Sequence, residues 1–287
     1  MNVKKVLKRI PCVAQLYKTI TTSFKTHTQK RIFKQLDHTS YAQGPKLKEM
    51  LERLDRALPP SEQHWITNIE SERQQLLNRN EPLNDGSFEK GGLYDDNQTI
   101  KQACEVSKPP KPALMLFLLT RIIAPQRVIE LGTNVGISSA YIGAALKVNR
   151  DKGKLITLDM SPYRQRLAKT IHHHLSIDNI SYIEGFFADT LSQALEDMGS
   201  VDLAFIDGHH QYQPTLDYFE EILRFAAADA VFVFDDIRWS DDMKKAWFKI
   251  QSDERLGLIV DLFSVGICVR RRETMSQRHI LQPLNVL

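Results

Sequence analysis

This chain has few cysteines, no long apolar run and only a small net charge. Its three cysteines, Cys12, Cys104 and Cys268, are widely spaced, which excludes a disulfide framework and a paired-cysteine zinc motif. No apolar run approaches the roughly 18 residues of a membrane span. A net charge of +3 does not indicate a nucleic-acid-binding chain. We therefore expect a cytoplasmic protein in a reducing compartment, with no export signal and no specific nucleic-acid partner.

The small net charge conceals an uneven distribution. Residues 1–36 hold nine Lys or Arg and no acidic residue, and their apolar positions recur at close to helical spacing, with a break expected at Pro11. One interpretation is an amphipathic segment on the inner membrane face or on a partner. The other is a basic helix packed on the body of the protein, and the pattern leaves both open.

Helical patterns continue to about residue 98. Leucines and a methionine form a stripe over residues 47–58, and Ser61 is expected to cap a helix that runs through Leu77. Turn-forming residues then predict a loop over residues 78–98. We expect a helical N-terminal region over residues 1–98, followed by a second domain over residues 99–287.

From Arg127 the pattern changes to short apolar strands that alternate with helices of 10–15 residues. This alternation predicts an α/β fold with a mostly parallel, Rossmann-like sheet covered on both faces. Two final strands with a tight turn near Ser264 predict an antiparallel hairpin and seven strands in all. The expected strands are 128–131, 155–158, 180–183, 203–206, 230–234, 257–262 and 265–270. The expected helices include 113–123, 138–148, 163–175, 190–198, 215–227 and 241–250.

The first strand ends in a glycine turn, where Gly132 and Gly136 flank Asn134. Glycine allows a tight turn and a close ligand approach, and the helix that follows offers free N–H groups. The second strand ends at Asp159, where a carboxylate can accept both hydroxyls of an adenosine ribose. Together these features favour an adenosyl ligand over a purely structural turn. The spacing is GxxxG rather than the GxGxxG of dinucleotide sites, so a phosphate-free nucleoside fits better than NAD.

Carboxylates also follow the fourth and fifth strands, at Asp207, Asp235 and Asp236. Oxygen ligands that converge in this way suit a hard divalent ion such as Mg²⁺. The alternative is that Asp235 caps a loop and Asp236 is solvated.

Histidines follow Asp207 directly. His210 is a candidate general base for a substrate hydroxyl, although a hydrogen-bonded structural histidine is equally ordinary. A separate run, His172 to His174, lies within a helix and is expected to be solvated.

These motifs resemble those of class I S-adenosylmethionine-dependent methyltransferases. The layout of residues 127–271 is similar to the catechol and caffeoyl-CoA O-methyltransferase branch. By that resemblance Gly132, Asn134, Gly136 and Ser138 line the methionine part of S-adenosylmethionine. Asp159 holds the ribose, and the segment around Phe187 and Ala188 borders the adenine. The expected cofactor-binding set is completed by Glu130, Thr133, Met160 and Asp207.

The same resemblance makes Asp207, Asp235 and Asp236 the metal ligands. The sequence differs from the family pattern at two positions. Asp236 stands where the third metal ligand is usually Asn, and His210 stands where the catalytic residue is usually Lys. Ser107-Lys-Pro-Pro-Lys-Pro, the Asp207-Gly-His-His segment and the Asp235-Asp-Ile-Arg-Trp segment also resemble a group of bacterial methyltransferases whose substrates are not known to us. The segment 104–111 is expected to close over the cofactor.

We therefore expect O-methylation of a small-molecule or sugar-containing acceptor, with His210 and Asp207 as the catalytic residues and with Mg²⁺ as an expected helper. The expected partners are the small-molecule acceptor, a membrane surface for residues 1–36, and a second copy in a homodimer. Two alternatives remain: N-methylation of RNA or an amine, and a catalytically silent cofactor-binding module. Asp207-Gly-His-His differs from the Asn/Asp-Pro-Pro-aromatic motif of base-methylating enzymes, which argues against base methylation. Trp247 is expected to lie in the core.

Overall fold

The computed structural model describes residues 29–83, 98–150, 152–272, 274 and 277–281. A helical stretch at residues 29–38 precedes the labelled helices. The labelled helices are α3 (Gln43–Arg53), α4 (Pro60–Leu77), α5 (Ile100–Glu105), α6 (Pro110–Ile123), α7 (Ile137–Asn149), α8 (Pro162–His174), α9 (Phe187–Met198), α10 (Tyr212–Phe225) and α11 (Asp241–Gln251). The strands are β1 (Arg127–Leu131), β2 (Lys154–Asp159), β3 (Ile180–Glu184), β4 (Val201–Ile206), β5 (Ala226–Phe234), β6 (Leu256–Asp261), β7 (Gly266–Arg270) and β8 (His279–Leu281).

All these strands belong to one sheet in the order β3-β2-β1-β4-β5-β7-β6-β8. The first five are mutually parallel, whereas β7 is antiparallel to both β5 and β6. The predicted α/β class and the antiparallel hairpin are confirmed. Over the described residues the sheet has eight strands rather than the predicted seven, because His279–Leu281 pairs in parallel with β6. Three residues are too few to produce a recognisable apolar run.

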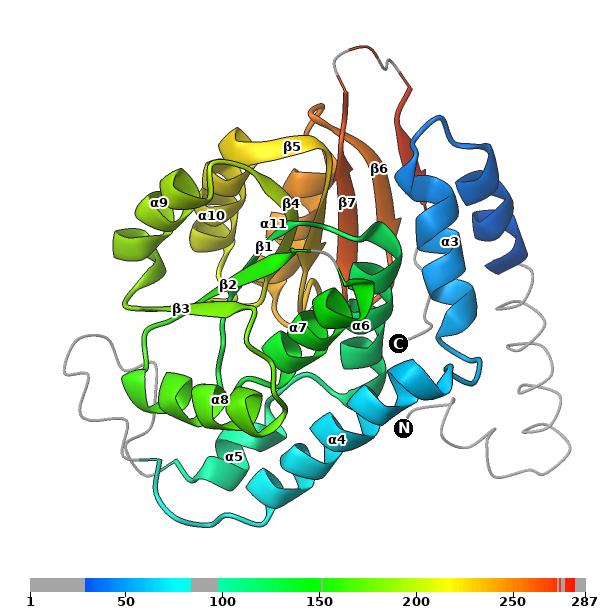
Figure 1. Cartoon of the computed structure of the whole chain (residues 1–287). Helices are drawn as coiled ribbons and strands as arrows, with labels where there is room; N and C mark the ends of the chain where they lie inside the picture. The colour runs from blue at the N-terminus through cyan, green and yellow to red at the C-terminus, as the bar shows by residue number, and fades with distance from the viewer. Residues whose placement is uncertain (1–28, 84–97, 151, 273, 275–276, 282–287) are drawn as a thin grey trace, which may run out of the picture.

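Helices cover both faces of the sheet, as Figure 1 shows. Helices α6, α7 and α8 lie on one face, and α9, α10 and α11 lie on the other. In β5, Val231 and Val233 belong to the first core, while Phe232 and Phe234 belong to the second. Burial on both faces explains why this strand is a continuous apolar run rather than an alternating one.

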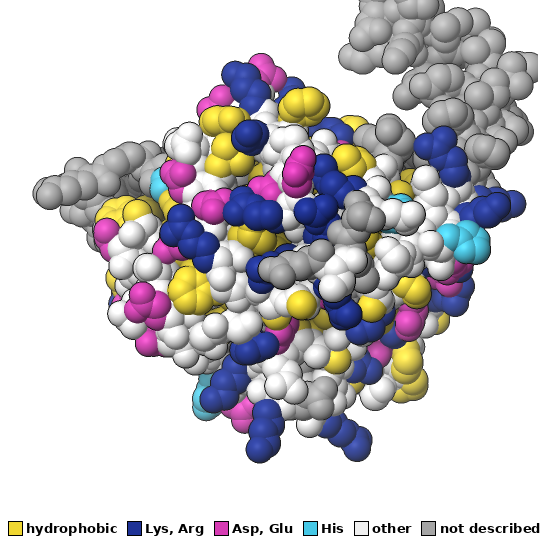
Figure 2. Space-filling view, turned by 90° about the horizontal axis from the view of Figure 1, so that it is seen from above, with side chains coloured by type: hydrophobic (Ala, Val, Ile, Leu, Met, Phe, Trp, Pro, Cys, Tyr) yellow, Lys and Arg dark blue, Asp and Glu magenta, His cyan; other side chains and the backbone are white. Residues whose placement is uncertain are grey.

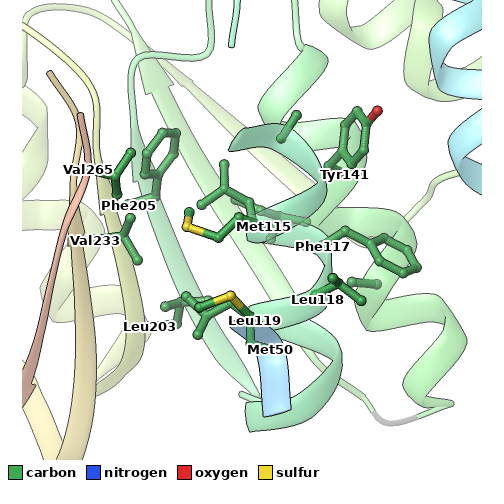
Figure 3. Close-up of a cluster of buried hydrophobic side chains, with 14 of the residues drawn as sticks. Met50, Met115, Phe117, Leu118, Leu119, Tyr141, Leu203, Phe205, Val233 and Val265 are labelled. Carbon is green, nitrogen blue, oxygen red and sulfur yellow. The ribbon is translucent and has the colours of Figure 1, made fainter. Parts of the chain in front are cut away.

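The N-terminal helices add a layer outside α6 and α7. The close-up in Figure 3 shows Met50 of α3 beside Leu119 of α6 and Leu203 of β4, and all three side chains are buried. Tyr141 of α7 donates a hydrogen bond to Glu70 of α4, with 2.7 Å between Oη and Oε1. The N-terminal helices therefore share a single core with the sheet.

The segment predicted as an amphipathic helix is only partly within the described residues. Its last part, residues 29–38, is helical and buries Ile32 and Leu36 almost completely in the main core. In this part the apolar face packs on the body of the protein. Residues 1–28 lie outside the described residues.

Two predicted boundaries are wrong. Helix α4 begins at Pro60 after Pro59, and Ser61 does not cap it. Helix α10 ends at Phe225, because Ala226 already starts β5. Alanine-rich sequence suits either structure, so only pairing with β4 decides where the strand begins. Most of the predicted loop, residues 84–97, lies outside the described residues.

Across the described ranges, every helix is too short or too polar to cross a membrane.

Candidate cofactor and acceptor site

The glycine turn joins β1 to α7 at the carboxyl edge of the sheet. Gly132 has φ of +101°, and a Cβ there would lie 2.1 Å from the carbonyl oxygen of Asp207. The Gly132 N–H donates to the carbonyl of Leu158 on β2 at 2.9 Å, and the Asp207 N–H donates to Leu131 at 3.0 Å. Only glycine fits where the ends of three strands meet so closely.

Gly136 begins α7 in the left-handed region, with φ of +86°. A Cβ there would lie 2.6 Å from the Cβ of Ala168 on α8, so the turn packs tightly against that helix. No side chain caps α7. The first N–H groups of the helix are therefore able to bind an acceptor group of a ligand.

Asp159 ends β2 beside this turn and is almost fully buried. Its Oδ2 accepts the N–H of Asn134 at 2.7 Å, and its Oδ1 accepts the N–H of Ser161 at 2.9 Å. Backbone donors of this kind stabilise the ionised carboxylate. The two bonds fix the side chain against the turn, at the position expected for the ribose-binding acid.

Asn134 connects the turn to the segment before α6. Its side-chain amide donates to the carbonyl of Ala103 at 2.9 Å and to Ser107 Oγ at 3.3 Å. Its Oδ1 accepts a hydrogen bond from Arg164 at 2.7 Å, and Arg164 also contacts Gln98. Parts of residues 98–107 thus lie against the glycine turn, and closure of the segment 104–111 over a cofactor stays a prediction.

Glu130 lies beneath the turn rather than at its surface. The hydroxyls of Ser139 and Thr157 donate to its carboxylate, the second at 2.7 Å, and Thr133 joins the network by a 2.6 Å hydroxyl contact with Thr157. Burial raises the pKa of Glu130 to about 7, although hydrogen bonds from Ser138 and its neighbours act in the opposite direction. Glu130 and Thr133 are therefore placed to support the turn.

The residues expected near the adenine come from the β2 and β3 ends. Met160 is partly exposed and Ala188 is exposed. Phe187 begins α9, and its ring lies 5.4 Å from that of Tyr218 in an edge-on arrangement. A Cβ on Gly208 would lie 2.5 Å from the Phe187 ring, so this aromatic side chain packs beside the end of β4.

The predicted metal ligands do come to this edge, but a lysine lies among them. Lys108 Nζ forms an ion pair with Asp235 and lies 4.0 Å from Asp207 Oδ2. The side chain of Asp235 is 2% exposed and that of Lys108 is 9% exposed. Within the described part of the chain, Lys108 is the only residue that donates to the carboxylate of Asp235.

These residues do not fit the predicted magnesium site. Among the described residues, no group of three His, Cys, Asp or Glu side chains is arranged to hold a metal ion. The ammonium of Lys108 already supplies the positive charge that buried Asp235 requires. A divalent ion would have to displace that buried ammonium.

His210 lies at the other side of Asp207. Its Nε2 is 3.5 Å from Asp207 Oδ1, and its side chain is 30% exposed. His209 and His210 both have positive φ, at 64° and 40°. Strained backbone of this type is common at functional sites, and here it directs His210 toward Asp207. His209 instead contacts Tyr218, with 2.7 Å between Nδ1 and Oη.

His172 was expected to be solvated, and that prediction is wrong. The residue is 1% exposed. Its Nε2 lies 2.8 Å from the carbonyl oxygen of Gly136, and its Nδ1 lies 2.6 Å from the Tyr182 hydroxyl. Because a carbonyl only accepts, Nε2 carries the proton and Nδ1 accepts from Tyr182. Burial lowers the pKa of His172 to about 4. His172 therefore supports the glycine turn as a neutral ring.

Two tryptophans near the site have different environments. Trp247 is buried and donates from Nε1 to Asp261 at 3.0 Å, which confirms the prediction that it lies in the core. Trp239 is 74% exposed.

Sequence patterns missed Lys108 and Arg164 as site residues. Lys108 lies within the segment 104–111, which was expected to close over the cofactor, but its side chain was given no role of its own. Arg164 carries no such signal, since it is a basic residue in a helix that has several.

A hollow lies at the opposite edge of the sheet. It is lined by residues that include Gln43, Arg127, Asp202 and Asp229, at the amino ends of β1, β4 and β5. None of the predicted site residues lines it. Figure 2 shows the face on the side of the β7–β8 loop, where basic and acidic side chains intermix. Ion pairs such as Arg127–Asp202 (2.8 Å) are typical of such a solvated surface.

The fold and the glycine turn define the class of protein. Residues 129–237 match the family model of a methyltransferase domain. This match covers less than half of the chain, and together with the sheet order it indicates a class I methyltransferase-like fold.

Particular relatives agree on this class. The chain is 29% identical over 163 residues to an O-methyltransferase of Aspergillus hancockii, a match that covers 55% of this chain and 62% of that protein. It is 30% identical over 134 residues to a catechol O-methyltransferase of Niastella koreensis, covering 46% and 58%. The matches thus span less than two thirds of these relatives' own lengths.

Solved structures show the same fold. A methyltransferase of Podospora anserina bound to S-adenosylhomocysteine superposes with a TM-score of 0.55 at 15% identity, covering 82% of this chain and 97% of that one. An O-methyltransferase of Bacillus cereus in complex with S-adenosylhomocysteine gives 0.51 at 17% identity, covering 78% and 96%.

Proposed function

We propose that this chain is an S-adenosylmethionine-dependent methyltransferase that methylates an oxygen of a small-molecule acceptor. The proposal rests on one observation: three features lie together at one edge of the sheet. They are the glycine turn, the start of α7 and the Asp159 carboxylate. The methyltransferase family match over residues 129–237 supports it. The named O-methyltransferases among the relatives support oxygen as the acceptor atom.

The residues at this edge suit an adenosyl ligand without phosphates. Asp159 offers carboxylate oxygens for ribose hydroxyls, and the turn around Gly132 and Asn134 offers backbone close to the ligand. When bound, the cofactor supplies a methyl group on a positively charged sulfur. The buried network below the turn, around Glu130 and His172, keeps this surface rigid.

The acceptor would lie beside Asp207 and His210. In the proposed reaction His210 removes the acceptor hydroxyl proton. With the proton held on His210, the acceptor oxygen would take the methyl group that a bound cofactor supplies, in exchange for the bond between that methyl carbon and the cofactor's sulfur. Positioning of the two reactants supplies much of the rate enhancement. Asp207 is 3.5 Å from the ring and would orient it.

Magnesium assistance, a homodimer and membrane contact remain predictions. We include none of them in the proposed mechanism, and the environment of Lys108 argues against the first. The alternatives of N-methylation and of a silent binding module are distinguished from this proposal by turnover of hydroxyl acceptors such as catechols.

Calorimetric titration with S-adenosylhomocysteine tests the cofactor site. We expect the wild type to bind and Asp159→Asn to bind about tenfold to a hundredfold more weakly, since one charged hydrogen-bond partner contributes about 1.5–3 kcal/mol. Asp202→Asn is the matched control. Its carboxylate also accepts backbone N–H groups, from Gln126 at 3.0 Å and Arg127 at 2.9 Å, but at the opposite edge. Equal losses in both variants, or no binding by the wild type, would refute the proposed site.

A further inference from the structure

The cluster formed by Lys108, Asp207 and Asp235 places a buried cation at the centre of the acceptor site. Lys108 Nζ contacts Asp235 and lies 4.0 Å from Asp207, and the side chains of Lys108 and Asp235 are almost fully buried. Asp235 receives no other donor from the described residues. Burying a carboxylate without a compensating cation is strongly unfavourable, so this ammonium is required by its surroundings.

The position of Lys108 is determined by rigid neighbours on both sides. Pro109 and Pro110 follow it at the start of α6, whose residues Leu116 and Phe117 are buried in the main core. On the other side, the Ser107 N–H donates to Cys104 at 3.0 Å, which closes the turn after α5. Lys108 is thus held at the site by its backbone as well as by its charge.

The same segment touches the cofactor turn. Ala103 and Ser107 accept hydrogen bonds from Asn134, and the next residue, Lys108, reaches the carboxylates at the ends of β4 and β5. One short stretch of chain therefore spans the expected cofactor and acceptor positions. On the opposite side of Asp207 lies His210.

We propose that Lys108 is the resident cation of this site and takes the place of a divalent metal ion, so that acceptor binding and methyl transfer need no metal. This inference rests on the proposed function for the nature of the acceptor, but the ion pair does not depend on it. An ammonium has three N–H donors, and two can serve Asp235 and Asp207. The third can donate to the acceptor oxygen while His210 removes its proton, which stabilises the negative charge that develops there.

Metal binding tests this assignment without an acceptor. Mn²⁺ is the probe, because it accepts the same hard oxygen ligands as Mg²⁺. We expect calorimetry to detect no saturable Mn²⁺ site in the wild type. Lys108→Met removes the ammonium and leaves two uncompensated carboxylates, so we expect it to gain a saturable Mn²⁺ site. The double variant Lys108→Met with Asp235→Asn should lose that site again.

Two single variants serve as controls. Lys111→Met removes an exposed lysine of the same segment, which pairs with Asp55 at 2.9 Å, and should behave as the wild type does. Lys108→Arg keeps the positive charge and should bind no Mn²⁺. Circular dichroism establishes that each variant is folded. If Lys108→Met does not fold, Mn²⁺ binding by the wild type and by Asp235→Asn tests the inference instead. We expect neither protein to bind Mn²⁺.

Two results would overturn the inference. One is saturable Mn²⁺ binding by the wild type that Asp235→Asn abolishes. The other is a folded Lys108→Met that binds no Mn²⁺. Titration of S-adenosylhomocysteine into the same samples keeps the two proposals separate. If the wild type does not bind S-adenosylhomocysteine, the proposed function is refuted. The Mn²⁺ result still tests the assignment of Lys108 on its own.

Discussion

Single residues at the carboxyl edge are held by partners that lie far away in the sequence. Asp159 accepts N–H groups from the turn after β1, and Lys108 reaches Asp235, which lies more than a hundred positions later in the sequence. Burial, more than local sequence, sets the chemistry of these groups. Glu130 and His172 show this most clearly, because burial raises the pKa of the first and lowers the pKa of the second.

His172 makes stability depend on pH in a defined direction. Burial lowers its folded pKa to about 4, whereas an unfolded histidine titrates near 6.5. Between these values the unfolded chain binds more protons, so His172 causes stability to fall as the pH falls from 6.5 towards 4. Its contribution approaches about 1.4 kcal/mol per pH unit. We expect the free energy of unfolding of His172→Gln, measured with urea, to vary less steeply than that of the wild type over this range.

The exposed neighbour His173 provides the control. His173→Gln should follow the wild-type profile. A His172→Gln profile that also parallels the wild type would show that this ring is already accessible to protons in the native state.

Residue types at strand ends could be read from the sequence, but their partners could not. Gly132, Asp159 and Asp207 were recognisable because each stands at the end of an apolar strand, and Gly136 because it precedes the next helix. The contact between Lys108 and Asp235 brings together two segments whose relation depends on how α6 packs on the sheet. The burial of His172 was missed because three consecutive histidines in a helix give no indication of which one faces inward.

At the scale of elements, the short helix α5 positions the segment that lies against the glycine turn. Thr99 and Gln102 form a capping box, in which the Gln102 N–H donates to Thr99 Oγ1 at 3.2 Å and the Thr99 N–H donates to Gln102 Oε1 at 2.8 Å. A helix of six residues depends strongly on its cap. The sequence pattern does not indicate that the end of this helix carries Ser107 and Lys108 into the site.

Loss of this cap should loosen α5. We expect Thr99→Ala to lower the free energy of unfolding by about 1 kcal/mol and to speed amide hydrogen exchange in residues 100–107. Thr99→Ser keeps the hydroxyl and should restore most of both. Unchanged exchange in Thr99→Ala would mean that packing, rather than the cap, holds the helix.

Strands and helices of the α/β region were predicted well because their apolar runs are long and strictly alternate in type. Errors occurred where local signals were weak. The three residues of β8 are too few to form a recognisable apolar run, and the start of β5 lies within alanines that suit either structure.

At the scale of the whole molecule, the two edges of one sheet carry different sets of side chains. The carboxyl edge carries the glycine turn, Asp159 and the Lys108 cluster, and parts of residues 98–108 lie against it. The amino edge carries the polar hollow around Arg127 and Asp202. The N-terminal helices share the main core with the sheet, so they stabilise the frame that supports both edges.

The central claim is that an adenosyl methyl donor binds at the carboxyl edge, and hydrogen exchange of the wild type with and without S-adenosylhomocysteine tests it most directly. We predict slower amide exchange in residues 132–138 and 159–161 when the ligand is bound, with no change in residues 124–127 and 226–230 at the amino edge. Protection at the amino edge instead, or no protection anywhere with saturating ligand, would contradict the account.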